Sequence, residues 1–161
     1  FTSHFYSKEF WIFLSIILVF LTILSGGFMA GSHAGQSFNT YPLMNGKIIP
    51  DDYFIDDLGI LNFFENTVAI NFNHRWIATF AFLYIFSLFL YLSISNSLNI
   101  PIIFYLFVLV FLTLQFLLGI ITLVSNVDIA YASLHQTNSI LLLSSLLICY
   151  LKIKVKKEIY E

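Results

Sequence analysis

The stretch PIIFYLFVLVFLTLQFLLGIITLV, residues 101–124, carries no charged side chain. About 20 helical residues, each rising 1.5 Å, span the roughly 30 Å hydrocarbon core of a membrane, so this stretch is long enough to cross one. Pro101 is a favourable first residue for a helix, because its missing N–H would have no helical partner there. The stretch therefore predicts a transmembrane helix.

Three further apolar runs of similar length lie at about residues 10–30, 72–94 and 131–151. Of the 161 residues, 59% are hydrophobic and only 10% are charged, whereas soluble domains carry roughly 25% charged residues. The connections at 95–100 and 125–130 are short, which makes consecutive helices antiparallel neighbours. The predicted fold class is an all-α integral membrane protein, with the whole chain forming one bundle of four transmembrane helices.

The charge and cysteine content exclude several classes of function. Seven Lys and Arg residues stand against nine Asp and Glu, a net charge of −2, so no face could neutralise the phosphates of a nucleic acid. Cys149 is the only cysteine, which excludes an internal disulfide and any site built from several cysteines, such as an iron–sulfur cluster.

The lysines predict the orientation in the membrane. Lys8 precedes the first run, and four lysines follow the last one: Lys152, Lys154, Lys156 and Lys157. Because cytoplasmic segments are enriched in Lys and Arg, both ends of the chain are expected on the cytoplasmic or matrix side. The segment 32–70 has Lys47 as its single basic residue and five acidic ones, which places it on the outer side.

This outer loop is longer than the roughly 12 to 15 residues of most structureless connections. After Pro50, the apolar residues Phe54, Leu58 and Leu61 recur at the spacing of one helix face. The pattern predicts a short amphipathic helix that lies over the outer mouth of the bundle.

Two histidines occupy matching positions in the apolar runs. His74 lies near the start of the second run and His135 near the start of the fourth, and both runs enter from the outer side. Imidazoles at one depth on two helices are what an axial pair for haem iron requires, with the haem between the helices. The alternative is that two interfacial histidines are simply satisfied by local hydrogen bonds.

Small and polar side chains lie on the same helix faces as these histidines, which would leave room for a flat ligand. They are Ala78, Ala81, Ala132, Ser139, Gln115, Gly119 and Thr122. Gly27, Gly31 and Gly35 follow one another at steps of four residues near the end of the first run. For these three glycines, ordinary close packing between helices is the favoured explanation.

Three other charged or titratable residues need an interpretation. Arg75 could pair with a haem propionate, pair with Glu65 or Asp128, or extend to the lipid headgroups. His33 in the outer loop and His4 before the first run are expected to be solvated histidines and not ligands.

A set of short segments stands out in the outer loop and the last three runs. In chain order the segments are AGSHAG at 30–35, NTYPLMNG at 39–46 with Pro50, FEN at 64–66, FNHR at 72–75, Gln115 with LGI at 118–120, TL at 122–123, and LHQ at 134–136. Together, from about Gly27 to Gln136, they resemble the C-terminal half of haem A synthases. The combination is specific, although each segment alone would be weak.

The resemblance implies a function and a cofactor. Haem A synthases are polytopic membrane enzymes that oxidise the C8 methyl of haem O to a formyl group, giving haem A for cytochrome oxidase assembly. Their fold is a tandem duplication of four-helix bundles, each with a pair of histidines near the outer face. By resemblance, this chain is the half that binds a b-type haem through the iron ligands His74 and His135, with Arg75 beside the haem.

The resemblance also implies what the chain lacks. In the N-terminal half of the family, a catalytic glutamate precedes the first histidine by three residues, and Asn71 occupies that position here. The chain is therefore expected to carry no catalytic residue, to be inactive alone, and to be the C-terminal half of a longer chain, a half-length family member being the alternative. The implied partners are haem O bound by the N-terminal half, membrane lipid, haem O synthase and an electron acceptor, in a bacterial plasma membrane or, alternatively, a mitochondrial inner membrane.

Two other functions remain open at this point. A small b-type transmembrane cytochrome would share the pair of histidines but would only carry electrons. A membrane subunit without redox chemistry would use both histidines for packing alone.

Overall fold

The computed structural model describes residues 8–95 and 100–160, and side chains up to residue 155. It consists of four long helices: α1 (Lys8–Gly31), α3 (Thr67–Ser95), α4 (Ile102–Val124) and α5 (Ile129–Tyr160). Predictions that concern His4, the connection at 96–99 and the side chains of Lys156 and Lys157 lie outside the described residues.

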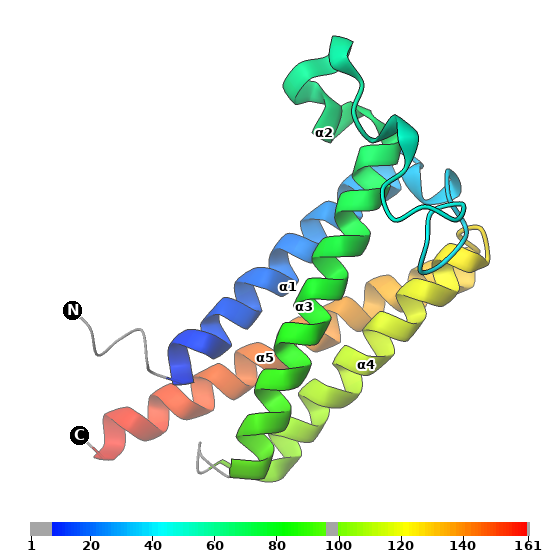
Figure 1. Cartoon of the computed structure of the whole chain (residues 1–161). Coiled ribbons are helices and arrows are strands. Elements are labelled where there is room, and N and C mark those ends of the chain that lie inside the picture. The colour runs from blue at the N-terminus through cyan, green and yellow to red at the C-terminus, as the bar shows by residue number, and fades with distance from the viewer. Residues whose placement is uncertain (1–7, 96–99, 161) are drawn as a thin grey trace.

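The four long helices form an antiparallel bundle (Figure 1). α1 packs beside α3 and α5, and α4 packs beside the same two helices, so the four surround one interior. Each contains a stretch long and apolar enough to span a membrane, and large apolar side chains such as Phe80 and Leu83 face outward, about 60% exposed. Such outward faces are stable in lipid and not in water. The predicted all-α integral membrane fold is confirmed.

The helices extend beyond the apolar runs at two places. α3 begins at Thr67, before the predicted start at residue 72, because the Asn66 side chain caps it by accepting a hydrogen bond from the N–H of Val68 (2.9 Å). α5 continues past residue 151 into the lysine-rich segment, since lysine is a good helix former. Hydropathy marks the membrane span, whereas capping and helix propensity set the helix ends.

The loop between α4 and α5 is closed by local hydrogen bonds. The N–H of Val127 donates to the carbonyl of Thr122 (2.9 Å), which satisfies the end of α4. The carboxylate of Asp128 accepts from the N–H of Ala130 (3.0 Å) at the start of α5. This short loop and the long loop between α1 and α3 lie at the same end of the bundle (Figure 1).

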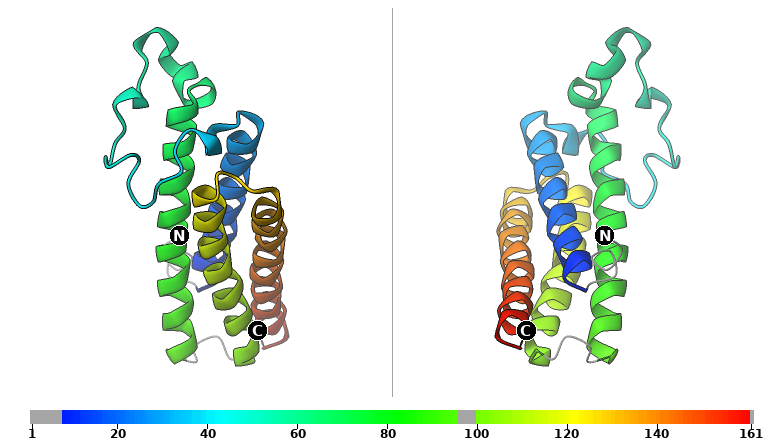
Figure 2. Two further views of the ribbon diagram at one scale, coloured as in Figure 1. Left: turned by 90° about the vertical axis from the view of Figure 1, so that its right-hand side faces the viewer. Right: turned by 90° about the vertical axis from the view of Figure 1, so that its left-hand side faces the viewer.

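The long loop, residues 32–66, contains four short elements: η1 (Ala34–Gln36), η2 (Asp51–Tyr53), η3 (Asp56–Leu61) and α2 (Asn62–Glu65). Where the sequence pattern predicts a single short amphipathic helix after Pro50, the loop forms three shorter helices, η2, η3 and α2. Phe54 has extended backbone angles, and Gly59 has a positive φ of 50° that interrupts η3. Figure 2 shows this part of the loop projecting beyond the end of α3. The predicted cover over the mouth comes from earlier in the loop, around His33 and Tyr41.

The interior of the bundle has two different halves. In the half near the two chain ends, buried apolar side chains from all four helices pack together, including Ile12 of α1, Phe89 of α3, Val108 of α4 and Leu146 of α5. The half next to the long loop keeps apolar walls, such as Phe82 and Phe116, but a cavity there is also lined by glycine, alanine and polar side chains. The packed half holds the helices in place and the other half is left for a site.

Candidate functional site

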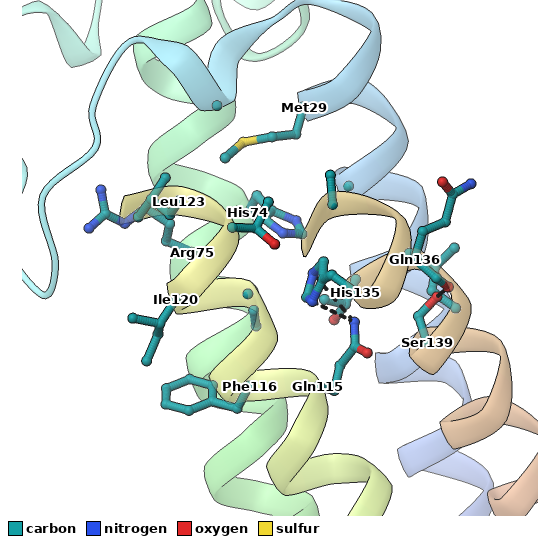
Figure 3. Close-up of a pocket in the computed structure, with 18 of the residues that line it drawn as sticks. Met29, His74, Arg75, Gln115, Phe116, Ile120, Leu123, His135, Gln136 and Ser139 are labelled. Carbon is teal, nitrogen blue, oxygen red and sulfur yellow. Dashed lines mark hydrogen bonds between the residues drawn. The ribbon is translucent and has the colours of Figure 1, made fainter. Parts of the chain in front are cut away.

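A cavity of about 440 Å³ occupies the half of the bundle next to the long loop. All four long helices and the first part of the long loop line it. Figure 3 shows His74, His135 and Gln115 on three different helices around this space. A cavity of roughly 300 to 1,000 Å³ is typical of sites for small molecules and cofactors.

His74 and His135 reach this cavity at the same level. Each lies about two turns past the first residue of its helix, which is about 10 Å along the axis at 1.5 Å per residue. Both helices begin at the long-loop end of the bundle. The structure therefore brings together the two histidines that the sequence pattern singled out. Because α3 and α5 begin before the predicted apolar runs, His74 lies five residues and His135 two residues further into its helix than expected.

His74 is held by α1. Its Nδ1 lies 2.8 Å from the hydroxyl oxygen of Ser25. The ring also packs against Gly26, where a Cβ atom would come within 3.3 Å of His74 Cε1. The neighbouring Ser25 and Gly26 thus fix one edge of the imidazole from the adjacent helix.

His135 is held by α4 in a corresponding way. The amide nitrogen of Gln115 lies 3.2 Å from Nδ1 of His135, and a Cβ atom at Gly119 would come within 3.0 Å of its Cε1. Asn138 donates to the amide oxygen of Gln115 (2.8 Å) and to the carbonyl of Phe111 (2.9 Å). Each histidine therefore projects from one helix and packs against a glycine of a neighbouring helix, His74 against α1 and His135 against α4.

Arg75 lies at the side of the cavity and binds the long loop. Its Nη2 donates to the carbonyl of Thr40 (2.6 Å) and to that of Pro42 (3.2 Å), and its guanidinium lies 5.6 Å from the centre of the Tyr41 ring. Nη1 is buried without a hydrogen-bond partner. Within residues 8–95 and 100–155, Arg75 forms no ion pair with a carboxylate, Glu65 and Asp128 included.

The small residues predicted to flank the histidines all line the cavity. They are Ala78, Ala81, Ala132, Ser139, Gln115, Gly119 and Thr122. Of the three glycines at four-residue steps, Gly27 and Gly35 line it and Gly31 does not. A Cβ atom at Gly27 would have no neighbour within 4 Å, so close helix packing does not explain that glycine. His33 lies exposed at the rim.

Asn71 has a different role from that of a cavity residue. Its side chain is fully buried, donates to the carbonyl of Ala34 (2.8 Å) and is not part of the cavity lining. It therefore attaches the beginning of the long loop to α3. The Asn71 Oδ1 atom is buried without a hydrogen-bond partner.

Sequence reasoning missed four residues of this site: Ser25, Gly26, Tyr41 as a contact of Arg75, and Asn138. A hydroxyl beside a Gly-Gly pair in an otherwise apolar run was the available signal for the first two. Nothing in the spacing of Tyr41 or Asn138 showed which side chain it would meet. Among the described residues no group of three or more His, Cys, Asp or Glu side chains could hold a metal ion by itself.

Comparison with known proteins places the chain in a family. The family model COX15-CtaA, described as cytochrome oxidase assembly protein, matches residues 7–147. The chain is 36% identical over 148 residues to the "Heme A synthase" of Wolbachia pipientis wMel, which covers 91% of this chain and 40% of that protein. It is 40% identical over 129 residues to the one of Pelagibacter ubique, covering 80% and 37%.

The similarity extends to a haem A synthase of another bacterium, Nitrosomonas eutropha, at 38% identity over 138 residues and 36% of that protein's length. This chain therefore spans about two fifths of the length of the curated relatives it matches. No solved structure matches it. With the family model matching nearly the whole four-helix bundle, the chain belongs to the COX15-CtaA family of cytochrome oxidase assembly proteins.

Proposed function

We propose that this chain is the half of a haem A synthase that binds a b-type haem, with His74 and His135 as the two residues that would hold the iron. One observation carries the proposal, namely that the two imidazoles reach one cavity at one level from two different helices. His74 and His135 would supply the two ligands that a bis-histidine haem takes from the protein. The lack of a third protein ligand among the described residues is consistent with this arrangement.

The residues around the histidines also fit a haem. The glycine and alanine residues that line the cavity take up little of its volume. The buried Nη1 of Arg75 has no partner, and a guanidinium matches a carboxylate such as a propionate in both charge and geometry. The apolar wall of Phe82 and Phe116, whose rings stack 4.3 Å apart, would keep water from the porphyrin.

A haem with two histidine ligands supplies one-electron transfer and leaves no open position for oxygen or substrate. The residues of this chain then have three tasks: to hold the iron, to pair the propionates and to exclude water. Oxidation of haem O to haem A is assigned to the remaining part of the longer protein. The partners proposed with it are haem O synthase, an electron acceptor and membrane lipid.

We place both termini on the cytoplasmic side of a bacterial plasma membrane and the long loop on the outer side. Support comes from the lysines after the last span, of which Lys152 and Lys154 are exposed, and from the acidic side chains of the long loop. The histidine cavity then lies close to the outer surface.

The absorption spectrum of the purified chain tests the haem assignment. The wild-type chain should carry a low-spin haem b with a sharp α band when reduced. His74→Ala and His135→Ala should each remove this signature or make the haem high-spin, because six-coordinate iron cannot keep two imidazoles after one is lost.

His33→Ala is the matched control, since it removes an imidazole at the rim of the same cavity and should leave the spectrum unchanged. An unaltered low-spin spectrum in either of the other two variants would rule out that histidine as a ligand. A wild-type chain that takes up no haem would favour the packing role for both histidines.

A further inference from the structure

We propose that Ser25 is a positioning residue for His74: its hydroxyl accepts a hydrogen bond from Nδ1–H and so directs the free Nε2 of the imidazole into the cavity. The inference rests on the proposed function, in which His74 is an axial ligand of haem. It concerns a residue of α1 that the haem itself would not need to touch.

The hydrogen bonds of Ser25 determine which atom donates. Its Oγ lies 2.8 Å from the carbonyl oxygen of Thr22 and 2.8 Å from Nδ1 of His74. A hydroxyl has a single hydrogen, and a carbonyl oxygen can only accept. Both contacts are hydrogen bonds only if Ser25 donates to Thr22 and accepts from Nδ1–H of His74.

This arrangement selects one tautomer of the neutral imidazole. With the proton on Nδ1, the lone pair lies on Nε2, which is the nitrogen left for a metal. Ligating histidines in metal sites commonly donate their other N–H to such a partner, which fixes the ring orientation and makes the ligand more basic. Gly26 supports the same orientation, because the ring lies directly against its backbone.

The environment of His135 is different. The amide oxygen of Gln115 is already used as the acceptor for Asn138, so Gln115 turns its NH₂ group, a donor, toward the imidazole. Among the side chains that the structure describes, Ser25 is thus the only one that accepts a hydrogen bond from a ring N–H of His74 or His135, and it does so at His74. Loss of its hydroxyl should therefore change the basicity of His74 and not that of His135.

A more basic ligand stabilises ferric over ferrous iron, so the Ser25 hydroxyl should lower the reduction potential of the haem. Ser25→Ala should raise the midpoint potential and weaken haem binding by about 10- to 100-fold, the usual effect of losing such a partner. Ser25→Thr keeps a hydroxyl that can bond both groups and should stay close to the wild type in both measurements.

The variants are made in the haem-loaded chain, and potentials are measured by redox titration of the α band. Ser32→Ala is the matched control, because Ser32 makes the same kind of bond to a helix carbonyl (2.7 Å to Phe28) but contacts neither histidine. In Ser25→Cys the thiol is similar in size to the hydroxyl but is only a weak hydrogen-bond acceptor. This variant should therefore behave like Ser25→Ala, which would show that the lost hydrogen bond, and not lost packing, causes the effect.

The outcomes separate the two proposals. A wild-type chain without low-spin haem would contradict the proposed function and this inference with it. A wild-type chain with low-spin haem whose potential and haem affinity are unchanged in Ser25→Ala and Ser25→Cys would contradict the role of Ser25 alone. A rise in potential in both variants, reversed in Ser25→Thr and absent in Ser32→Ala, would establish it.

Discussion

Two glycines determine how closely the imidazoles approach the neighbouring helices. Gly26 of α1 faces His74, and Gly119 of α4 faces His135. The contact at Gly119 is the tighter one, with 3.0 Å between a hypothetical Cβ atom and Cε1 of His135. Because cores are closely packed, even one added methyl group at such a contact must move its neighbour.

Gly119→Ala should therefore weaken haem binding by roughly tenfold, comparable to the loss of a residue that orients a ligand. The added methyl group must push the His135 ring by a few tenths of an ångström, whereas the helix itself gains up to about 1 kcal/mol from alanine. Haem titration of the apo chain measures the effect.

Gly31→Ala provides the control, because it adds the same methyl group to a helix at a position with no neighbour within 4 Å. Equal haem affinities in the two variants would show that Gly119 does not hold His135 in its ligating position.

At the scale of elements, α3 organises both the site and the long loop. Its residues Asn71, Asn73 and Arg75 bind the loop at Ala34, Tyr53 and Thr40. His74 lies between them and points into the bundle. One helix thus carries the proposed iron ligand and the attachments of the loop that covers it.

The far part of the long loop depends on Asn62. This buried side chain accepts from the N–H of Ile55 and donates to the carbonyl of Tyr53, both at 2.9 Å. Asn62→Ala should leave the N–H of Ile55 unpaired and the carbonyl of Tyr53 with only its longer bond from Asn66 (3.3 Å), at a local cost of about 1 to 3 kcal/mol. Hydrogen exchange of the Ile55 amide should then be roughly ten- to a hundredfold faster, because that free energy opens the segment locally.

The haem spectrum should stay unchanged in Asn62→Ala, since this segment does not line the cavity. Asn39→Ala, at an exposed position of the same loop, is the control and should leave the exchange of Ile55 as it is. Unchanged exchange at Ile55 in Asn62→Ala would show that the segment is held by other contacts.

These elements differ in how far the sequence predicts them. The four spans follow from hydropathy alone, because a membrane helix needs a long apolar run and little else. The turns of the long loop are set by Asn62 and Asn66 bonding to backbone atoms up to 14 residues away, and such bonds have no periodic pattern. The histidines were visible as isolated polar residues at matching depth, whereas Ser25 became meaningful only once α1 was placed beside α3.

The whole molecule combines a packed half with a hollow half. Large apolar side chains fill the bundle near the chain ends, whereas the histidines lie at a cavity that small, polar and apolar side chains line together. In a membrane the helices gain little from burying apolar surface against each other. Close side-chain packing in the half near the chain ends must therefore keep the helices at the right separation around the cavity in the other half. A haem in the cavity would supply the apolar contacts that side chains supply elsewhere.

Formation of haem A should require more than this chain. Among the described residues no carboxylate lines the cavity, and Asn71, which the resemblance sets at the place of a catalytic glutamate, is buried against Ala34. An amide cannot accept a proton as a carboxylate does. In a bacterial strain without its own haem A synthase, the chain should therefore yield bound haem b but no haem A in the extracted haems, and a second copy of the same chain should not help.

Asn71→Glu should be equally inactive, because position 71 faces the start of the long loop and not the cavity. A full-length haem A synthase in the same strain is the positive control. Co-expression of the N-terminal half of such an enzyme should restore haem A, and His74→Ala in this chain should abolish it again through loss of the haem ligand. Haem A produced by the 161 residues alone would show that the oxidation needs neither the second bundle nor the glutamate.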